Sequence, residues 1–319
     1  LDPYLLPGLG EGLEAAQKGV AEDCKLRMLV AYTPGAAASF DDMLSFVQLA
    51  IDEINFGNEE CLVNYEVELA RVMRVNFDEG ALTGDSILTL FQTEGDSVMD
   101  DTHDDRRLFD ADMCALLIRP NPALCGIAAT IRSTYSSAFH VTVALNCAVS
   151  NHSFMHETGH LLGCRHDVFV DDKETPYPRG HGYVWYPDLW RTVMAYNDFC
   201  DCQDEWLICP DVNDRETPFF PWCDRLPFWS SPDLTFNGIP FGSDTLEDNV
   251  RVWNTYAPNV INFESYIVNK QFYDSRLIAA DESFDIHGAN SVVIGDGETV
   301  EIQAGGSGQF RAGHEIVIG

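Results

Sequence analysis

Basic residues are scarce in this chain of 319 residues, and long apolar runs are absent. Lys and Arg number 19 against 51 Asp and Glu, so the formal net charge is −32. A field of that sign repels nucleic acid and anionic membrane surfaces, and we expect neither as a partner. No apolar run reaches the roughly 18 residues that a bilayer span requires, so the sequence predicts no membrane insertion.

The sequence also lacks a secretory signal at its start and paired CxxC zinc motifs. Residues 1–23 have neither a basic start nor an apolar stretch, and we interpret them as an N-terminal leader or propeptide remnant left after signal removal. The ten cysteines are dispersed and even in number, which fits disulfides in an oxidising compartment; buried free thiols are the alternative. We therefore predict a secreted protein. Cys125–Cys147 and pairs within 200–223 are candidate disulfides, because spacing alone leaves the connectivity open.

Helical and strand patterns alternate over the first 150 residues and predict an α/β (α+β) fold with one mixed sheet, complete before residue 150. The predicted strands cover 25–32, 64–75, 112–118, 126–131 and 139–145. The predicted helices run from a cap at Ser39 to near Gly57, from Thr83 to about Met99, from a cap at Asn151 or Ser153 through Leu162, and over 244–256, stopping before Pro258.

The composition changes near residue 266. Beyond it there is no Cys, Trp or Pro, and short segments alternate at a period of two between Gly turns, which favours a small all-β module. We therefore divide the chain into 1–23, a catalytic domain over 24–265, and a C-terminal module over 266–319. The last segment ends in mid-pattern, so we expect the natural chain to continue.

Three histidines and a glutamate stand together in the segment HETGHLLGCRHD, while the other six of the nine histidines are scattered singly. His156 and His160 are four residues apart, which places both imidazoles on one face of a helix. Gly163 permits a positive backbone torsion that ends the helix and reverses the chain, so that His166 can approach the same point. Three neutral imidazoles predict a Zn²⁺ site with one position left open, as catalytic sites have.

Glu157 lies one step around the helix from the predicted ligands. Zinc lowers the pKa of its water, and this carboxylate is placed to accept the proton and pass it to a leaving amine. The predicted reaction is therefore amide hydrolysis. A bare HExxH arises by chance in unrelated helices, but the added Gly and His at fixed offsets make coincidence rare.

The pattern HExxHxxGxxH resembles the signature of the metzincin zinc endopeptidases, which also have a methionine turn downstream. RTVMAY over 191–196 resembles that turn, and the resemblance implies that Met194 forms an apolar base beneath the metal. Tyr196 then matches a tyrosine near the metal that stabilises an oxyanion or acts as a loose fifth ligand. A buried tyrosine with no such role is the alternative.

Asp167, directly after the third histidine, resembles the adamalysin and reprolysin pattern, where this residue orients local backbone. Further segments are similar to the bacterial reprolysin-like group that includes the peptidyl-Asp metallopeptidases, and the similarity spans about 24–265. These segments are LVAYTPGA, CGIAAT, FWSSPDLTFNG and APNVINFES. The resemblance implies a metzincin-type two-lobed zinc protease domain with a mixed five-stranded sheet, whose edge strand, near 126–131 or 139–145, holds an extended substrate. The tail resembles repeat-like β segments of exported bacterial proteins with a C-terminal sorting system.

The same resemblance implies cleavage next to acidic residues, which requires a cation in the substrate pocket. Arg191 is our candidate, with Arg179 and Arg165 as others, although Arg191 fits a structural ion pair equally well. Ca²⁺ is a second candidate ion, at Asp171 with Asp172 or at Asp201 with Asp204 and Glu205. We expect Cys24 to form a disulfide rather than to block the zinc, and His140, His152 and His181 to be structural.

Taken together, the residues predict a monomeric secreted zinc endopeptidase that acts on a protein or peptide. A catalytically idle domain of the same fold that binds matrix or peptide is the alternative, and Glu157 argues against it because metal binding alone has no need of that carboxylate. A metal-dependent amidase for small substrates is disfavoured by the strand-rich substrate lobe.

Overall fold

The computed structural model describes residues 24–201, 222–261, 263 and 282, together with seven C-terminal strands. Five strands of the N-terminal part form one sheet in the order β2-β1-β3-β5-β4. They are β1 (Lys25–Tyr32), β2 (Glu66–Arg74), β3 (Met113–Ile118), β4 (Gly126–Ala128) and β5 (Phe139–Val143). All pair in parallel except β4, which runs antiparallel to β5. The predicted mixed five-stranded arrangement is confirmed, and of the two candidate edge strands it is β4 that lies at the edge.

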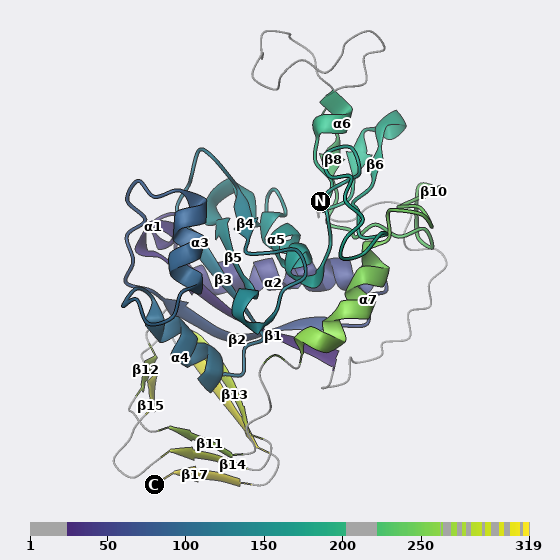
Figure 1. The fold of residues 1–319 in the computed structure, drawn as a ribbon. Helices are drawn as coiled ribbons and strands as arrows, with labels where there is room; N and C mark the ends of the chain where they lie inside the picture. Colours follow the sequence, from purple (N-terminus) through teal and green to yellow (C-terminus); the bar gives the residue numbers. More distant parts are fainter. Residues whose placement is uncertain are drawn as a thin grey trace.

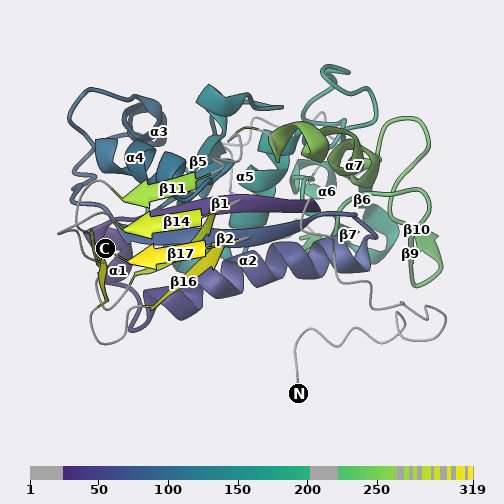
Figure 2. The same ribbon diagram turned by 90° about the horizontal axis from the view of Figure 1, so that it is seen from below.

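Helices cover both faces of this sheet (Figure 2). One face carries α2 (Met43–Glu60), α5 (Ser153–Leu162) and α7 (Asn249–Val260), which share the larger apolar core. The other face carries α3 (Gly84–Gln92) and α4 (Asp100–Leu108) over a second core. Because alternate side chains of a strand point to opposite faces, the buried β1 divides its residues between the two cores.

Short elements complete the part of the chain that surrounds α5. They are α1 (Pro34–Ala37), η2 (Tyr135–Ser137), η3 (Ala144–Ala148), β6 (Val184–Trp185), η4 (Tyr186–Asp188), β7 (Trp190–Arg191), α6 (Asp198–Asp201), β8 (Asp224–Arg225), β9 (Thr235–Phe236) and β10 (Ile239–Pro240). In Figure 1, β6, β8 and α6 lie to one side of the main sheet, beyond the end of α5.

Several predicted helix limits are wrong. Asp42, not Ser39, caps α2 through a bond from the Ser45 backbone N–H. The helix predicted from Thr83 to Met99 ends at Gln92, because the following loop has left-handed torsions at Gly95, Ser97 and Met99. The next helix, α4, was not predicted, since its sequence DDTHDDRRL has no apolar stripe.

The limits of α5 and α7 also differ from the prediction. His152, in a left-handed conformation and without a side-chain cap, precedes α5 in place of a cap at Asn151 or Ser153. Helix α7 starts after Asp248, whose carboxylate accepts the Arg251 N–H, and includes Pro258 in its last turn. A proline there interrupts few intrahelical bonds, because the helix ends two residues later.

The C-terminal strands extend the main sheet, which is therefore not complete before residue 150. Strand β13 (Ser283–Gly288) pairs antiparallel with β2, and β16 (Ser307–Ala312) pairs with β13, so the sheet has seven strands. The Glu282 carboxylate, just before β13, accepts a bond of 3.1 Å from Arg71 of β2. The remaining strands stack in parallel: β11 (Asn269–Phe272) with β14 (Ser291–Ile294) and β17 (Glu315–Ile318), and β12 (Arg276–Ile278) with β15 (Val300–Ile302). The all-β character of this segment is confirmed; the domain limits stay predictions.

Candidate metal centre

Helix α5 ends at the glycine that the sequence marks as a hinge. Gly163 has a φ of 105° and its N–H bonds back to the His160 carbonyl. A Cβ at this position would lie 2.8 Å from the Tyr177 ring, so both the torsion and the space require glycine. The chain then turns, and Nδ1 of His181 donates a hydrogen bond of 2.8 Å to the backbone carbonyl of His166.

The three predicted ligands meet at one point. The ligand nitrogens of His156, His160 and His166 all lie within 4.8 Å of one another. Nδ1 of His156 donates to the Val193 carbonyl at 2.9 Å, and Nδ1 of His160 to the Cys164 carbonyl at 2.8 Å. These bonds fix the tautomers so that each Nε2 presents a lone pair. In the described part of the chain this is the one cluster of His, Cys, Asp or Glu with ligand geometry.

The imidazoles are electrically suited to a cation. Burial lowers the pKa of His160 to about 4 and that of His166 to about 2, and burial followed by the Arg225 charge lowers the pKa of His156. All three rings are therefore neutral at pH 7. Nε2 of His160 and Nε2 of His166 face each other at 3.0 Å. Two lone pairs at that distance repel each other unless a cation lies between them, so the donor set fits Zn²⁺.

Glu157 points from α5 toward the edge strand β4. The Ala128 backbone N–H bonds to its carboxylate, and a Cβ on Gly126 would lie 2.6 Å from its Oε1 atom. Burial raises the pKa of Glu157 to about 8, against the lowering effects of Arg225 and of the Ala128 bond. The carboxylate thus lies against the edge of the sheet and lines one pocket together with His156.

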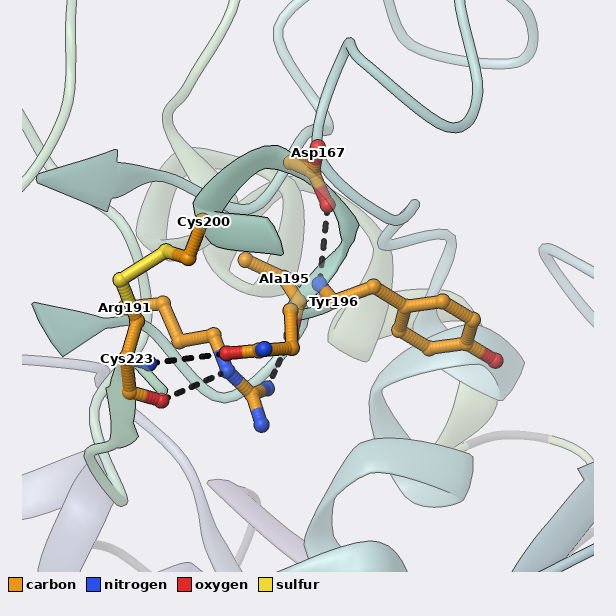
Figure 3. The surroundings of a disulfide bond; sticks show 7 residues. Asp167, Arg191, Ala195, Tyr196, Cys200 and Cys223 are labelled. Atoms are coloured by element: carbon orange, nitrogen blue, oxygen red, sulfur yellow. Dashed lines mark hydrogen bonds between the residues drawn. A yellow bond between two sulfur atoms is a disulfide. The ribbon is translucent and has the colours of Figure 1, made fainter. Parts of the chain in front are cut away.

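The predicted methionine turn lies beneath α5. Met194 is fully buried, and its sulfur would be 2.7 Å from a Cβ on Gly159, in the middle of the helix. Asp167 accepts the Tyr196 N–H at 2.8 Å and the Phe169 N–H at 3.2 Å, so it joins the segment after His166 to the turn (Figure 3). The residue Tyr196 is 41% exposed, and its ring centroid lies 4.0 Å from that of His166. The alternative of a buried tyrosine is therefore wrong.

Two disulfides occur in the described residues. Cys125–Cys147 joins the start of β4 to η3, and Cys200–Cys223 joins α6 to the residue before β8. The first matches the candidate pair from the sequence, and the second lies within the predicted 200–223 group. Cys24 has a free thiol, which contradicts the expected disulfide. Cys202 and Cys209 lie outside the described residues.

The arginines named as pocket candidates differ in their surroundings. Arg165 pairs with the Asp171 carboxylate, and Arg179 lines a separate hollow beside α7. Arg191 of β7 donates to the Cys223 and Ala195 carbonyls (Figure 3). Sequence reasoning missed Arg225 of β8, whose position after Cys223 carries no motif; it is the register of β8 beside β7 that brings it to the site.

A pocket of about 330 Å³ opens beside His156 and Glu157. Its other lining residues are Ala123, Leu124, Cys125, Gly126, Asn151, Ser153, Arg191, Tyr196, Asn197, Asp198, Trp222 and Arg225. Burial, and next the Arg191 charge, lower the pKa of Arg225 to about 9. Two guanidinium groups therefore line the pocket next to the predicted metal ligands.

The remaining predicted site residues lie elsewhere. The Asp171 carboxylate is occupied by Arg165, and Asp171 with Asp172 belongs to no ligand cluster in the described residues. The acidic side chains of Asp201, Asp204 and Glu205 lie outside the described part. The buried His140 ring has its centroid 5.0 Å from that of the Phe154 ring. Nδ1 of His152 lies 2.8 Å from Oε1 of Glu53.

Known proteins resemble this chain over most of its described length. A model of metallo-peptidase family M12 matches residues 22–204. A peptidyl-Asp metalloendopeptidase of Stenotrophomonas maltophilia is 38% identical over 242 residues, which are 74% of this chain and 52% of the relative. That of Xanthomonas campestris is 35% identical over 265 residues, 82% of this chain and 57% of the relative. The chain thus spans about half the length of these relatives.

A solved chaperone–substrate complex contains a chain with the same arrangement of elements. The TM-score is 0.55 with 17% identity, over 75% of this chain and 35% of that chain, and the likeness concerns the fold alone. None of the helices in the described residues has the length and apolarity that a membrane crossing needs.

Proposed function

Because the chain belongs to metallo-peptidase family M12, we propose that it is a secreted zinc endopeptidase that cleaves proteins or peptides next to acidic side chains. One observation carries the proposal: three neutral imidazoles converge on one point, and Glu157 lines the pocket beside one of them, His156. A set of ligands for a structural metal has no need of the carboxylate. The names of the curated relatives supply the preference for an acidic residue.

His156, His160 and His166 would hold the Zn²⁺ ion. When bound there, it supplies a Lewis acid that polarises a peptide carbonyl and makes water more acidic. The backbone carbonyls of Val193 and Cys164 keep two of the rings oriented. Such outer partners keep ligands in place between turnovers.

Glu157 is the proposed general base. A cation held by the neighbouring His156 would lower the pKa of this carboxyl from the value of about 8 that burial gives it, so that it is ionised. Its carboxylate accepts a proton from water as the water oxygen bonds to the peptide carbon, and returns a proton to the amine nitrogen as the C–N bond breaks. Its place between the rings and β4 fits this role, because a peptide alongside β4 would have its carbonyl near both. The Tyr196 hydroxyl is the proposed donor to the developing oxyanion.

Strand β4 is the proposed docking edge for the substrate. It pairs with β5 on one side only, so its other edge offers backbone groups to an extended peptide, which then joins the sheet as an added strand. The Cys125–Cys147 disulfide anchors the start of this strand. The disulfides also support secretion, since they persist in oxidising compartments. We expect the chain to be a monomer. The proposed mechanism does not require a calcium ion.

The Glu157→Ala variant tests the function. Removing a general base costs about 10²- to 10⁴-fold in rate, whereas the three imidazoles remain, so zinc should stay at one ion per chain. Hydrolysis of a peptide library, with mass spectrometry of the products, measures the activity, and elemental analysis measures the metal. An idle binding domain would show no cleavage by the wild-type chain. A variant that keeps full activity would exclude Glu157 as the base.

A further inference from the structure

Arg225 has an unusual neighbour. Strands β7 and β8 pair in parallel, with Arg191 directly opposite Arg225. Like charges directly opposite each other on paired strands are destabilising. Both side chains also line the pocket beside His156 and Glu157. Arg225 is therefore a cation that faces a like charge at the wall of this pocket.

The guanidinium of Arg225 is held in place by neutral groups. Its Nε atom donates to the Val193 carbonyl at 2.7 Å and its Nη1 atom to the Asn151 carbonyl at 2.9 Å. Its Nη2 atom lies next to Nδ1 of His156, which is itself a donor to the Val193 carbonyl. Among the described residues no carboxylate forms an ion pair with it. An arginine has five N–H donors, so at least two remain for a ligand.

Two of the three acids near Arg225 have other partners. Glu157 faces β4 and bonds to the Ala128 N–H. Glu53 pairs with His152 at 2.8 Å. Asp198 lines the same pocket but forms no ion pair in the described part of the chain. The positive charge of Arg225 therefore lacks a dedicated partner.

The other candidate arginines fit less well. Arg165 is neutralised by Asp171, and Arg179 lies at the separate hollow beside α7. Arg191 uses its Nε and Nη1 atoms to hold the Cys223 and Ala195 carbonyls, and its guanidinium lies 5.8 Å from the Trp222 ring centroid. With these groups engaged, Arg191 lines the pocket as a positively charged side chain.

We propose that Arg225 selects an acidic substrate side chain beside the scissile bond by donating hydrogen bonds to its carboxylate. Arg191 supports this contact as a second positive charge. The inference rests on the proposed function and adds the residue that determines specificity. A planar guanidinium matches a carboxylate in geometry and charge, and Arg225 lines the same pocket as His156 and Glu157, so the substrate acid would be bound beside the proposed reaction centre.

The test compares pairs of peptides that differ only in Asp against Asn, or Glu against Gln, on either side of the cleavage site. The measured quantity is the ratio of kcat/KM between acid and amide. Arg225→Gln should lower this ratio by about 10- to 100-fold, the effect of losing hydrogen bonds to a charged group. Arg225→Lys should fall in between. The matched control Arg179→Gln should keep the wild-type ratio, and zinc content and thermal unfolding verify each variant.

The outcomes separate the two proposals. A wild-type chain that binds zinc but cleaves no peptide refutes the proposed function. A wild-type chain that cleaves without preferring acids, or an Arg225→Gln variant that keeps the preference, refutes only the role of Arg225. If the variants fail to fold, phenylglyoxal modification of Arg225 in the intact wild type replaces them. An acidic peptide with a reduced scissile bond should slow the modification and its amide counterpart should not; equal rates refute the proposal.

Discussion

At the scale of single residues, the geometry of the candidate metal centre depends on glycines that a larger residue could not replace without displacing its neighbours. Gly163 turns the chain toward His166 in a left-handed conformation, and Gly126 leaves room for the Glu157 carboxylate. Neither glycine contributes a side chain to the site. Gly163 is required for its torsion and for space, whereas Gly126 is required for space alone.

Gly163→Ala should weaken zinc binding and lower the free energy of unfolding. The left-handed torsion alone costs about 1–2 kcal/mol with a Cβ, and the Tyr177 ring lies 2.8 Å from the new atom, so the turn must shift. Chelator titration measures the zinc affinity and urea unfolding the stability. Gly238→Ala is the matched control, because its φ of 81° gives the same backbone strain with no atom within 4 Å. Equal zinc affinity in both variants would contradict this account.

Some residues of the candidate site could be predicted from the sequence, and others could not. The spacing of His156, His160 and His166 around a glycine was enough to predict that they meet, because helix geometry and one turn are local. Arg225 could not be found this way. It reaches the site through pairing with Arg191, 34 positions earlier, and through contacts with Val193 and Asn151, and no local pattern marks such pairings.

At the scale of elements, the edge strand β4 and helix α5, which carries two of the proposed metal ligands, form one unit. They contact each other directly, and Glu157 fills the space over Gly126. Local patterns predicted both elements. They did not predict α4, which is almost entirely polar yet buries Thr102, His103, Asp105 and Arg106, because burial by hydrogen bonding leaves no apolar periodicity.

Gly126→Ala should reduce activity while zinc and fold are retained. The new Cβ would lie 2.6 Å from the Glu157 Oε1 atom, so the carboxylate must move, and a displacement of about 1 Å costs on the order of 100-fold in rate. Peptide hydrolysis gives the rate, and elemental analysis with thermal unfolding checks the rest. Ile127→Val, on the same strand, should leave kcat within about twofold. A fully active Gly126→Ala variant would show that Glu157 works from another position.

At the scale of the whole molecule, the arginines of the pocket contrast with the acidic composition of the chain. The chain has a formal charge of −32, whereas two arginines line the pocket. An acidic peptide is therefore repelled at long range and attracted at contact. Salt screens exposed charges beyond a Debye length more strongly than a partly buried contact, so the two effects can be separated.

Raising the NaCl concentration from about 0.01 to about 0.15 M, which shortens the Debye length from about 30 to about 8 Å, should raise kcat/KM for acidic peptides. Screening of the repulsion should speed their association by about 2- to 10-fold. The uncharged amide counterpart is the control and should change little. A decrease for the acidic peptides alone would mean that the contact in the pocket, rather than the surface field, dominates their capture.

The Cys200–Cys223 bond would let the proposed endopeptidase tolerate a cut in its own chain. A single autolytic nick anywhere between these two cysteines would divide the polypeptide, yet the pieces would remain covalently joined. The three histidines precede the disulfide in the chain and Arg225 follows it. The proposed metal ligands and the proposed specificity residue would therefore remain in one covalent molecule. Such a clipped molecule would migrate as one species in a gel until a reductant releases two.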